Sequence, residues 1–277
     1  MKVDEEKFQK EIPFVDLKLQ YENHREAFER ALINTAASTQ YVMGAEVTKF
    51  EKNFADFLGA REVVSVASGT DALRLSCLAL GLEPNDEVLV PANTFIASVL
   101  GISELGAKVV PVDVDPETHL IDLADAERRI TPKTKGVVPV HLYGQTLDMD
   151  SLMAFTERHG LFIIEDTCQA HGAEWNGRRA GTFGETGCFS FFPSKNLGAF
   201  GDGGAIAVNN SPLANKLRLL RNYGSVKKYI HEIPGTNSRL DSMQAAVLNV
   251  KLEFLERWNQ NRFHAACKYT NGLAGLT

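Results

Sequence analysis

The sequence predicts an α/β protein built on one mostly parallel sheet of seven strands with helices on both faces. The first observation is a series of seven short runs rich in β-branched residues, all after residue 62. The second is the amphipathic or apolar helical pattern that separates most of these runs. The third is an ordinary globular composition, with 44% hydrophobic and 23% charged residues among 277. Strands and helices in alternation are typical of βαβ units.

Composition and charge exclude several classes of protein. The hydrophobic fraction excludes a disordered chain, a collagen-like repeat and a coiled coil. The length suffices for one large domain, or for one domain and a fragment of another. The net charge is −6 and no long basic block occurs, so we expect no nucleic-acid partner.

The cysteines and the N-terminus predict a cytoplasmic protein. Four cysteines lie far apart, without metal-ligand spacing, and are expected to be reduced thiols: Cys77, Cys168, Cys188 and Cys267. We therefore expect no metal site. Residues 1–7 carry acids where a secretion signal needs a basic and then an apolar region. No apolar stretch approaches the roughly 18 residues of a membrane span.

The elements follow in order along the chain. Residues 21–35 and 46–58 have helical spacing and predict an N-terminal helical arm. The predicted strands are residues 63–66, 88–90, 108–114, 135–142, 161–165, 188–192 and 205–208. The predicted helices are residues 71–80, 95–105, 123–130, 149–159 and 212–223. A loop without a helix joins the last two strands, so we expect them to form an antiparallel edge.

The C-terminal part of the sequence predicts one long helix. Residues 240–262 form a continuous helical pattern that leads out of the large domain, and only fifteen residues follow Arg262. We expect a large domain over residues 1–240, and over residues 241–277 a long helix leading into a truncated second domain.

Lys195 is the first candidate for chemistry. It follows the apolar strand at 188–192 and precedes a glycine-rich loop at 198–204. Desolvation and nearby cations depress the pKa of a lysine and expose a nucleophilic amine, so Lys195 could form a Schiff base. The alternative is an ordinary surface lysine in a loop.

A turn after the first strand is the second candidate. Residues 68–73 lie where the strand at 63–66 meets a helix, and a helix N-terminus offers free N–H groups and a positive dipole end to a phosphate. An N-cap turn without a ligand fits the same residues. Neither a Walker A motif nor a GxGxxG motif is present, so no P-loop or dinucleotide site is supported.

Two acids at the end of a strand are the third candidate. Glu165 and Asp166 close the strand at 161–165, at the edge where ligands bind in open α/β folds. Asp166 could hold a protonated heterocyclic nitrogen, as pyridoxal phosphate (PLP) requires, or it could cap the next helix. Glu165 is expected to point to the opposite face. Nearby His171 is either a structural histidine or a catalyst.

Taken together, these segments resemble a known family. Six segments, in order, are similar to the PLP-dependent nucleotide-sugar aminotransferases of the DegT/DnrJ/EryC1/StrS family: residues 13–17, 68–73, 91–95, 140–144, 165–173 and 190–196. The likeness runs from Ile12 to Arg262. It implies the aspartate aminotransferase-like fold, PLP fold type I, with a C-terminal small domain that is largely missing here.

The resemblance also implies roles for individual residues. Lys195 would bind the cofactor covalently and carry the proton, and Asp166 would pair with the pyridine nitrogen. Phe95 would stack on the ring, and Gln169 would lie near the ring face or its phenolic oxygen. The phosphate would be bound by Gly69, Thr70 and Ser190. Asn237 would reach the phosphate of the neighbouring subunit, which implies a homodimer.

The resemblance is closest to the branch that acts on dTDP-3-keto-6-deoxyhexoses, through residues 221–241. It implies amino transfer from glutamate to C3 of such a sugar, with C4 amination as the alternative. The cations and aromatic rings of this stretch suit a diphosphate and a base, or they form a solvated basic loop: Arg221, Tyr223, Lys227, Lys228, Tyr229 and His231.

Two further alternatives concern the chemistry. Some relatives are sugar dehydratases with histidine at the lysine position, but position 195 is lysine. A non-catalytic regulator or scaffold with this fold is the other alternative.

Overall fold

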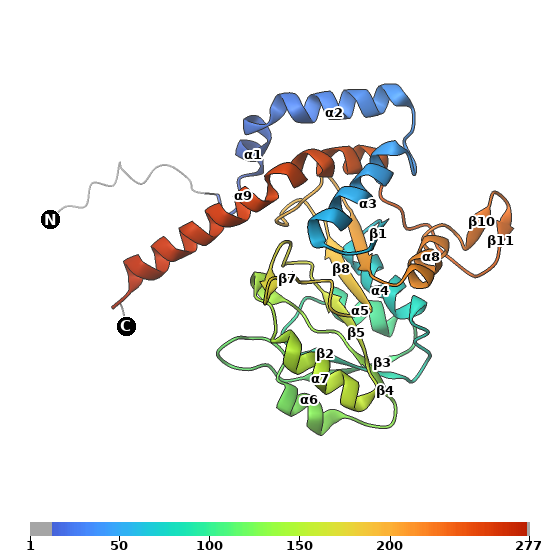
Figure 1. Ribbon diagram of the computed structural model, residues 1–277, viewed down its shortest axis with the longest axis vertical. Helices are drawn as coiled ribbons and strands as arrows, with labels where there is room; N and C mark the ends of the chain where they lie inside the picture. Colours follow the sequence, from blue (N-terminus) through green and yellow to red (C-terminus); the bar gives the residue numbers. More distant parts are fainter. Residues whose placement is uncertain (1–12, 276–277) are drawn as a thin grey trace.

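A seven-stranded sheet forms the centre of the computed structural model, which describes residues 13–275 (Figure 1). The expectation about a secretion signal falls on residues 1–12, outside the described part. The strand order across the sheet is β1-β9-β8-β5-β4-β2-β3. The strands are β1 (Glu62–Val66), β2 (Glu87–Pro91), β3 (Lys108–Val112), β4 (Thr134–Val137), β5 (Phe162–Asp166), β8 (Thr186–Ser190) and β9 (Gly204–Val208). The predicted fold class is confirmed.

The place of β9 differs from the prediction. Strands β2, β3, β4, β5 and β8 are parallel, and β9 is antiparallel to β8, as expected. However, β9 also pairs with β1, so that β1 and not β9 lies at the edge. The prediction that β8 and β9 form the edge of the sheet is therefore wrong, because β1 lies outside β9. The loop after β8 lets the chain reverse, but the pairing with β1 joins strands far apart in sequence, and local patterns do not report it.

Helices cover both faces of the sheet because neighbouring strand residues point in opposite directions. Ile164 packs in the core shared with α4 (Gly69–Ala79), α5 (Ala97–Ser103) and α8 (Ser211–Leu220). Ile163 faces the other side, where α6 (Leu123–Arg129) and α7 (Met149–His159) pack. On that same side, α3 (Ala45–Leu58) and α9 (Ser242–Leu273) cover Phe189.

Several element ends depart from the sequence pattern. The strand predicted at 135–142 stops at Val137, ahead of Pro139, and a 3-10 turn follows at Leu142–Gly144. The strand predicted at 188–192 stops at Ser190, before Pro193. The hairpins β6 (Glu174–Trp175) with β7 (Arg178–Arg179), and β10 (Ser225–Lys227) with β11 (Ile230–His231), are new. Strands of two or three residues are too short to show a hydrophobic period.

The helical arm and the long C-terminal helix are both present. Helices α1 (Leu17–Asn23), α2 (Arg25–Ser38) and α3 form the arm, and α2 lies along the first half of α9 (Figure 1). The outer part of α9 is exposed and runs out past the sheet (Figure 1). Within residues 13–275, no helix is long and apolar enough to cross a membrane.

One buried carboxylate braces the loop after the β6–β7 hairpin. Glu165 is fully buried and accepts three backbone N–H groups at 2.7 to 2.8 Å, from Gly181, Phe183 and Gly184. The Nδ1 atom of His141 accepts from the Leu147 N–H, so its Nε2–H donates to Glu165 at 3.0 Å. Glu165 therefore points away from Asp166, as predicted.

Candidate active site

The structure brings seven of the eight predicted site residues to one cavity of about 400 Å³. They are Gly69, Thr70, Phe95, Asp166, Gln169, Ser190 and Lys195. The cavity lies where the carboxyl ends of β1, β2, β5 and β8 meet, which is where open α/β sheets bind ligands. Its volume falls in the range of about 300 to 1,000 Å³ typical of small-molecule sites. We call it the sheet-edge cavity.

The start of α4 forms one wall of this cavity. Ser68 caps the helix by accepting the Asp71 N–H at 3.1 Å. Within the described residues, the N–H groups of Gly69 and Thr70 have no hydrogen-bond acceptor. A Cβ on Gly69 would lie 2.7 Å from the Ser190 Cβ, so only glycine allows this close approach. Two free donors at a positive helix end suit a phosphate.

Asn237 is the predicted residue that lies outside the sheet-edge cavity. It is exposed and pairs with Asn222 in an isolated bridge. Its neighbour Ser238 is buried and donates to the Asp71 carboxylate at 2.7 Å. The loop that bears Asn237 is thus fastened to the first turn of α4.

Asp166 is oriented by donors from two elements. It is 6% exposed, and its Oδ2 accepts the Ser98 hydroxyl at 2.7 Å. Its Oδ1 accepts the Cys168 N–H at 3.2 Å. Because the single proton of Ser98 goes to Asp166, Thr94 must donate in the 2.8 Å contact between the two hydroxyls. The sequence analysis missed Ser98, whose role depends on how α5 packs against β5.

Lys195 sits on a loop that α9 holds in place. The Lys195 N–H donates to the Phe192 carbonyl at 2.8 Å, and the side chain is half-buried. Next to it, the Asn196 amide donates to Asn259 of α9 at 2.8 Å. Asn259 in turn donates to the His171 carbonyl at 2.7 Å. Sequence reasoning missed Asn259, which lies 63 residues beyond Asn196 and shows no pattern beyond helical spacing.

His171 is a buried, neutral ring behind Lys195. Its ring lies 5.6 Å from that of Phe189 and 5.9 Å from that of Phe191, and it is 1% exposed. Within residues 13–275, neither ring nitrogen has a partner in hydrogen-bond geometry, although the Ser190 carbonyl is close enough to favour the charged ring slightly. Burial of the ring and the positive charge of Lys195 outweigh this effect of the Ser190 carbonyl, and they lower the pKa of His171 to about 3. The structural interpretation of His171 is therefore favoured.

Cys168 also lines the sheet-edge cavity, but it is not a nucleophile. Burial and the nearby Asp166 raise its pKa well above the ordinary value, so the thiol stays protonated. Cys168 and the other three cysteines are free. In the described part of the chain, no three His, Cys, Asp or Glu side chains gather as a metal site would need.

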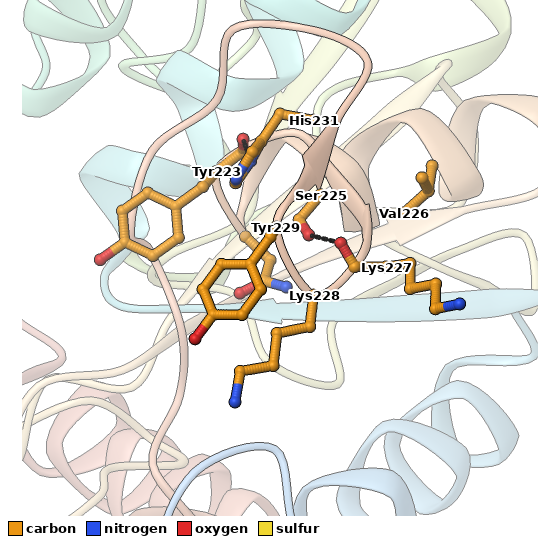
Figure 2. Close-up of a pocket in the computed structure, with 8 residues that line it drawn as sticks. Tyr223, Ser225, Val226, Lys227, Lys228, Tyr229 and His231 are labelled. Carbon is orange, nitrogen blue, oxygen red and sulfur yellow. Dashed lines mark hydrogen bonds between the residues drawn. The ribbon is translucent and has the colours of Figure 1, made fainter.

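A second cavity, of about 530 Å³, opens at the β10–β11 hairpin (Figure 2). The rings of Tyr223 and Tyr229 lie on one side of the loop, and Lys227 extends to the other side (Figure 2). The Lys228 ammonium lies 5.2 Å from the Tyr229 ring centroid. The hairpin therefore presents cations and aromatic faces together.

The expectation for Arg221 is wrong. It is 5% exposed and bonds to the Glu51 carboxylate and to the Ser65 carbonyl at 2.7 Å. Its charge thus joins α3, β1 and the end of α8, and it is not available to a diphosphate. A buried ion pair between distant segments leaves no local trace in the sequence.

Known proteins share this architecture. The model of the DegT/DnrJ/EryC1/StrS aminotransferase family matches residues 22–277. The dTDP-3-amino-3,4,6-trideoxy-alpha-D-glucose transaminase of Streptomyces venezuelae is 49% identical over 265 residues, which cover 96% of this chain and 70% of that protein. Both the resemblance and the fold that it implies are confirmed.

Solved structures agree. S. venezuelae DesV, in complex with a ketimine intermediate, superposes with a TM-score of 0.94 at 49% identity, covering 96% of this chain and 72% of that one. NtdA from Bacillus subtilis, with bound cofactor PMP, superposes with a TM-score of 0.91 at 35% identity, covering 97% and 62%.

The neutral state of His171 predicts a pH dependence of stability. Its pKa is about 3 in the folded chain and about 6.5 when unfolded. Between these values the unfolded chain binds a proton that the folded chain does not, so the free energy of unfolding falls as the pH is lowered. From pH 6.5 to 4.5 the parent should lose about 2 to 3 kcal/mol more than His171→Asn. Denaturant titrations measure this, and equal losses in both proteins would contradict it.

Proposed function

The chain belongs to the DegT/DnrJ/EryC1/StrS aminotransferase family, and from that premise we propose its reaction and cofactor. It transfers an amino group from glutamate to the C3 keto group of a dTDP-3-keto-6-deoxyhexose, using PLP. The observation that carries this proposal is the meeting of Lys195, Asp166 and the first turn of α4 in one cavity. The 49% identity to a dTDP-amino-sugar transaminase supports the substrate class.

The residues of the sheet-edge cavity fit the cofactor. The free N–H groups of Gly69 and Thr70, with Ser190 beside them, would hold the phosphate. Phe95, which is 70% exposed at the cavity, would stack on the ring, with Gln169 also near the ring. The oriented Asp166 carboxylate would accept the pyridinium N–H. When bound, this group acts as an electron sink for the substrate carbanion.

The remaining chemistry belongs to the protein. Ser98 and the Cys168 N–H hold the Asp166 carboxylate in one orientation, in which it can accept a hydrogen bond from a proton-bearing nitrogen. Lys195 would bind the cofactor covalently and then move the proton from the donor's α-carbon.

The β10–β11 hairpin is the proposed nucleotide site. Lys227 and Lys228 would approach the diphosphate, and Tyr223 and Tyr229 would contact the base or sugar. The positive charge at this site would come from flexible lysine side chains, since Arg221 is paired with the carboxylate of Glu51.

We also propose how the chain is divided. Residues 1–240 would be the cofactor domain, and residues 241–277 would be a long helix that leads from it into a smaller, truncated domain. The exposed apolar side chains of outer α9 support this division, since Phe263 is 67% exposed and Tyr269 is 72% exposed.

Asn237 predicts a homodimer with shared sites. Because it is exposed and lies outside the cavity of its own chain, it would serve the phosphate site of a second copy. Sedimentation velocity should give a dimer, and Asn237→Ala should bind PLP more weakly while remaining dimeric. An active monomer that carries the cofactor would contradict this.

Lys195 and Asp166 have separable roles that substitution can test. Lys195→Ala should lose amino transfer by at least about a hundredfold and should show no PLP fixed to the chain by borohydride. Asp166→Asn should keep the borohydride adduct but slow the half-reaction with glutamate, because a neutral amide does not stabilise the pyridinium. Lys268→Ala, an exposed lysine of α9, is the control. Normal turnover in Lys195→Ala would refute the assignment.

The site of amination is tested with two acceptors. The 3-keto and 4-keto dTDP-6-deoxyhexoses are supplied separately with glutamate or glutamine, and products are identified by mass and NMR. We expect amination of the 3-keto sugar with glutamate as donor. Amination of the 4-keto sugar alone would overturn the position, and no product from either would favour the scaffold alternative.

A further inference from the structure

The first turn of α4 contains a capping box that is only half formed. In such a box the N-cap serine accepts the N–H of the third helical residue, and an acid at that position accepts the serine N–H in return. Ser68 accepts the Asp71 N–H at 3.1 Å, so the first half is present. Within residues 13–275 the Ser68 N–H has no acceptor, so the Asp71 carboxylate does not complete the box. The residues of this turn favour a closed cap, and the structure leaves the cap open.

Ser238 holds the Asp71 carboxylate instead. Ser238 is fully buried, and its hydroxyl donates to Asp71 Oδ2 at 2.7 Å. The same hydroxyl accepts the Ala67 N–H at 3.1 Å, and the Ser238 N–H donates to the Arg221 carbonyl at 2.9 Å. Because a backbone N–H already points at the Ser238 oxygen, the single hydroxyl proton is directed to the carboxylate. Two backbone contacts thus fix the hydroxyl that binds Asp71.

The open box leaves the donors of this turn to the cavity. Ser68, Gly69 and Thr70 all line the sheet-edge cavity, where the phosphate is proposed to bind. A carboxylate that closed the box would occupy the Ser68 N–H and add a negative charge beside the free N–H groups of Gly69 and Thr70. A phosphate at those groups would then face a like charge at close range, which weakens its binding. The position of Asp71 therefore affects how well this turn holds an anion.

We infer that Ser238 is a positioning residue for the cofactor phosphate, because its hydroxyl keeps Asp71 from closing the capping box and leaves the N–H groups of this turn free. The inference rests on the proposed binding of PLP in the sheet-edge cavity. Ser238 does not line that cavity, so it acts through Asp71 and not by touching the cofactor. The alternative is that the bond between Asp71 and Ser238 only fastens the loop that bears Asn237. The two roles differ in what loss of the acid does.

Binding of PLP is compared with binding of pyridoxal, which carries the same aldehyde but no phosphate. Both are measured by equilibrium dialysis on the whole chain, without sugar or glutamate. Ser238→Ala should weaken PLP binding roughly tenfold and change pyridoxal binding by less than about twofold, because Asp71 is then free to close the box. Ser242→Ala is the matched control. Ser242 is also buried and its hydroxyl accepts the Gly44 N–H at 3.3 Å, so its loss should leave both affinities unchanged.

Removal of the acid separates the two roles of the bond. Asp71→Ala should bind PLP at least as tightly as the parent, since the carboxylate that could close the box is gone. The double variant with Asp71→Ala and Ser238→Ala should bind PLP within about threefold of Asp71→Ala alone, because the hydroxyl then has no acid to restrain. If the bond only fastened the loop, Asp71→Ala would weaken PLP binding as much as Ser238→Ala does. The measurement on Asp71→Ala decides the question even where Ser238→Ala does not fold.

Several results would overturn the inference. PLP binding to Ser238→Ala within about twofold of the parent would show that the hydroxyl does not matter for the phosphate. Equal losses of PLP and pyridoxal binding would show a general disturbance of the cavity, and weak PLP binding by Asp71→Ala would assign the bond to the loop. A parent that binds PLP no more tightly than pyridoxal would remove the phosphate site itself. Because no sugar is present, failure to aminate either keto sugar would refute the proposed reaction and leave the role of Ser238 standing.

Discussion

The alternation of side chains at the end of β5 is the constraint on which the site depends. Two adjacent acids point to opposite faces, and each meets a different set of donors. Glu165 is saturated by three backbone N–H groups and His141, which fixes the loop behind the sheet. Asp166 is left to face the cavity, where Ser98 and the Cys168 N–H fix its orientation but leave room to accept from a ligand. A shift of register by one residue would exchange these roles.

Strand order turns distant segments into one cavity. Because β9 lies between β1 and β8, Gly204 is paired with both Val66 and Ser190. A Cβ on Gly204 would come within 2.3 Å of the Ser68 carbonyl, and a Cβ on Gly69 would meet Ser190. The two glycines let the first turn of α4 rest directly on the ends of the strands. The free N–H groups therefore reach the cavity only because two side chains are absent.

The sequence allowed much of this to be predicted, and the failures share a physical cause. Strands such as β5 can be predicted from local apolar runs, and Lys195 and Asp166 lie close to the ends of such runs. By contrast, the pairing of β9 with β1, the burial of Arg221 against Glu51 and the support of Lys195 by Asn259 join residues far apart in the chain. The residues next to Asn259 and Arg221 in the sequence do not show whether these side chains bond to another part of the protein or point into solvent. Tertiary contacts alone decide these cases.

Helix α9 contacts residues 193–203, the segment that contains Lys195, at three points along its length. Gln244 accepts the Phe200 N–H at 2.8 Å, and the Lys251 ammonium lies 4.9 Å from the Phe200 ring. Burial without an acid partner lowers the pKa of Lys251 to about 8, so the aromatic contact replaces an ion pair there. Asn259 holds the other end of the loop. Along the helix, Gln244 is half-buried, Lys251 is buried, and residues 260–266, just beyond Asn259, are exposed. The position of Lys195 therefore depends on α9, because Asn259 anchors the neighbouring Asn196 immediately before that exposed stretch of the helix.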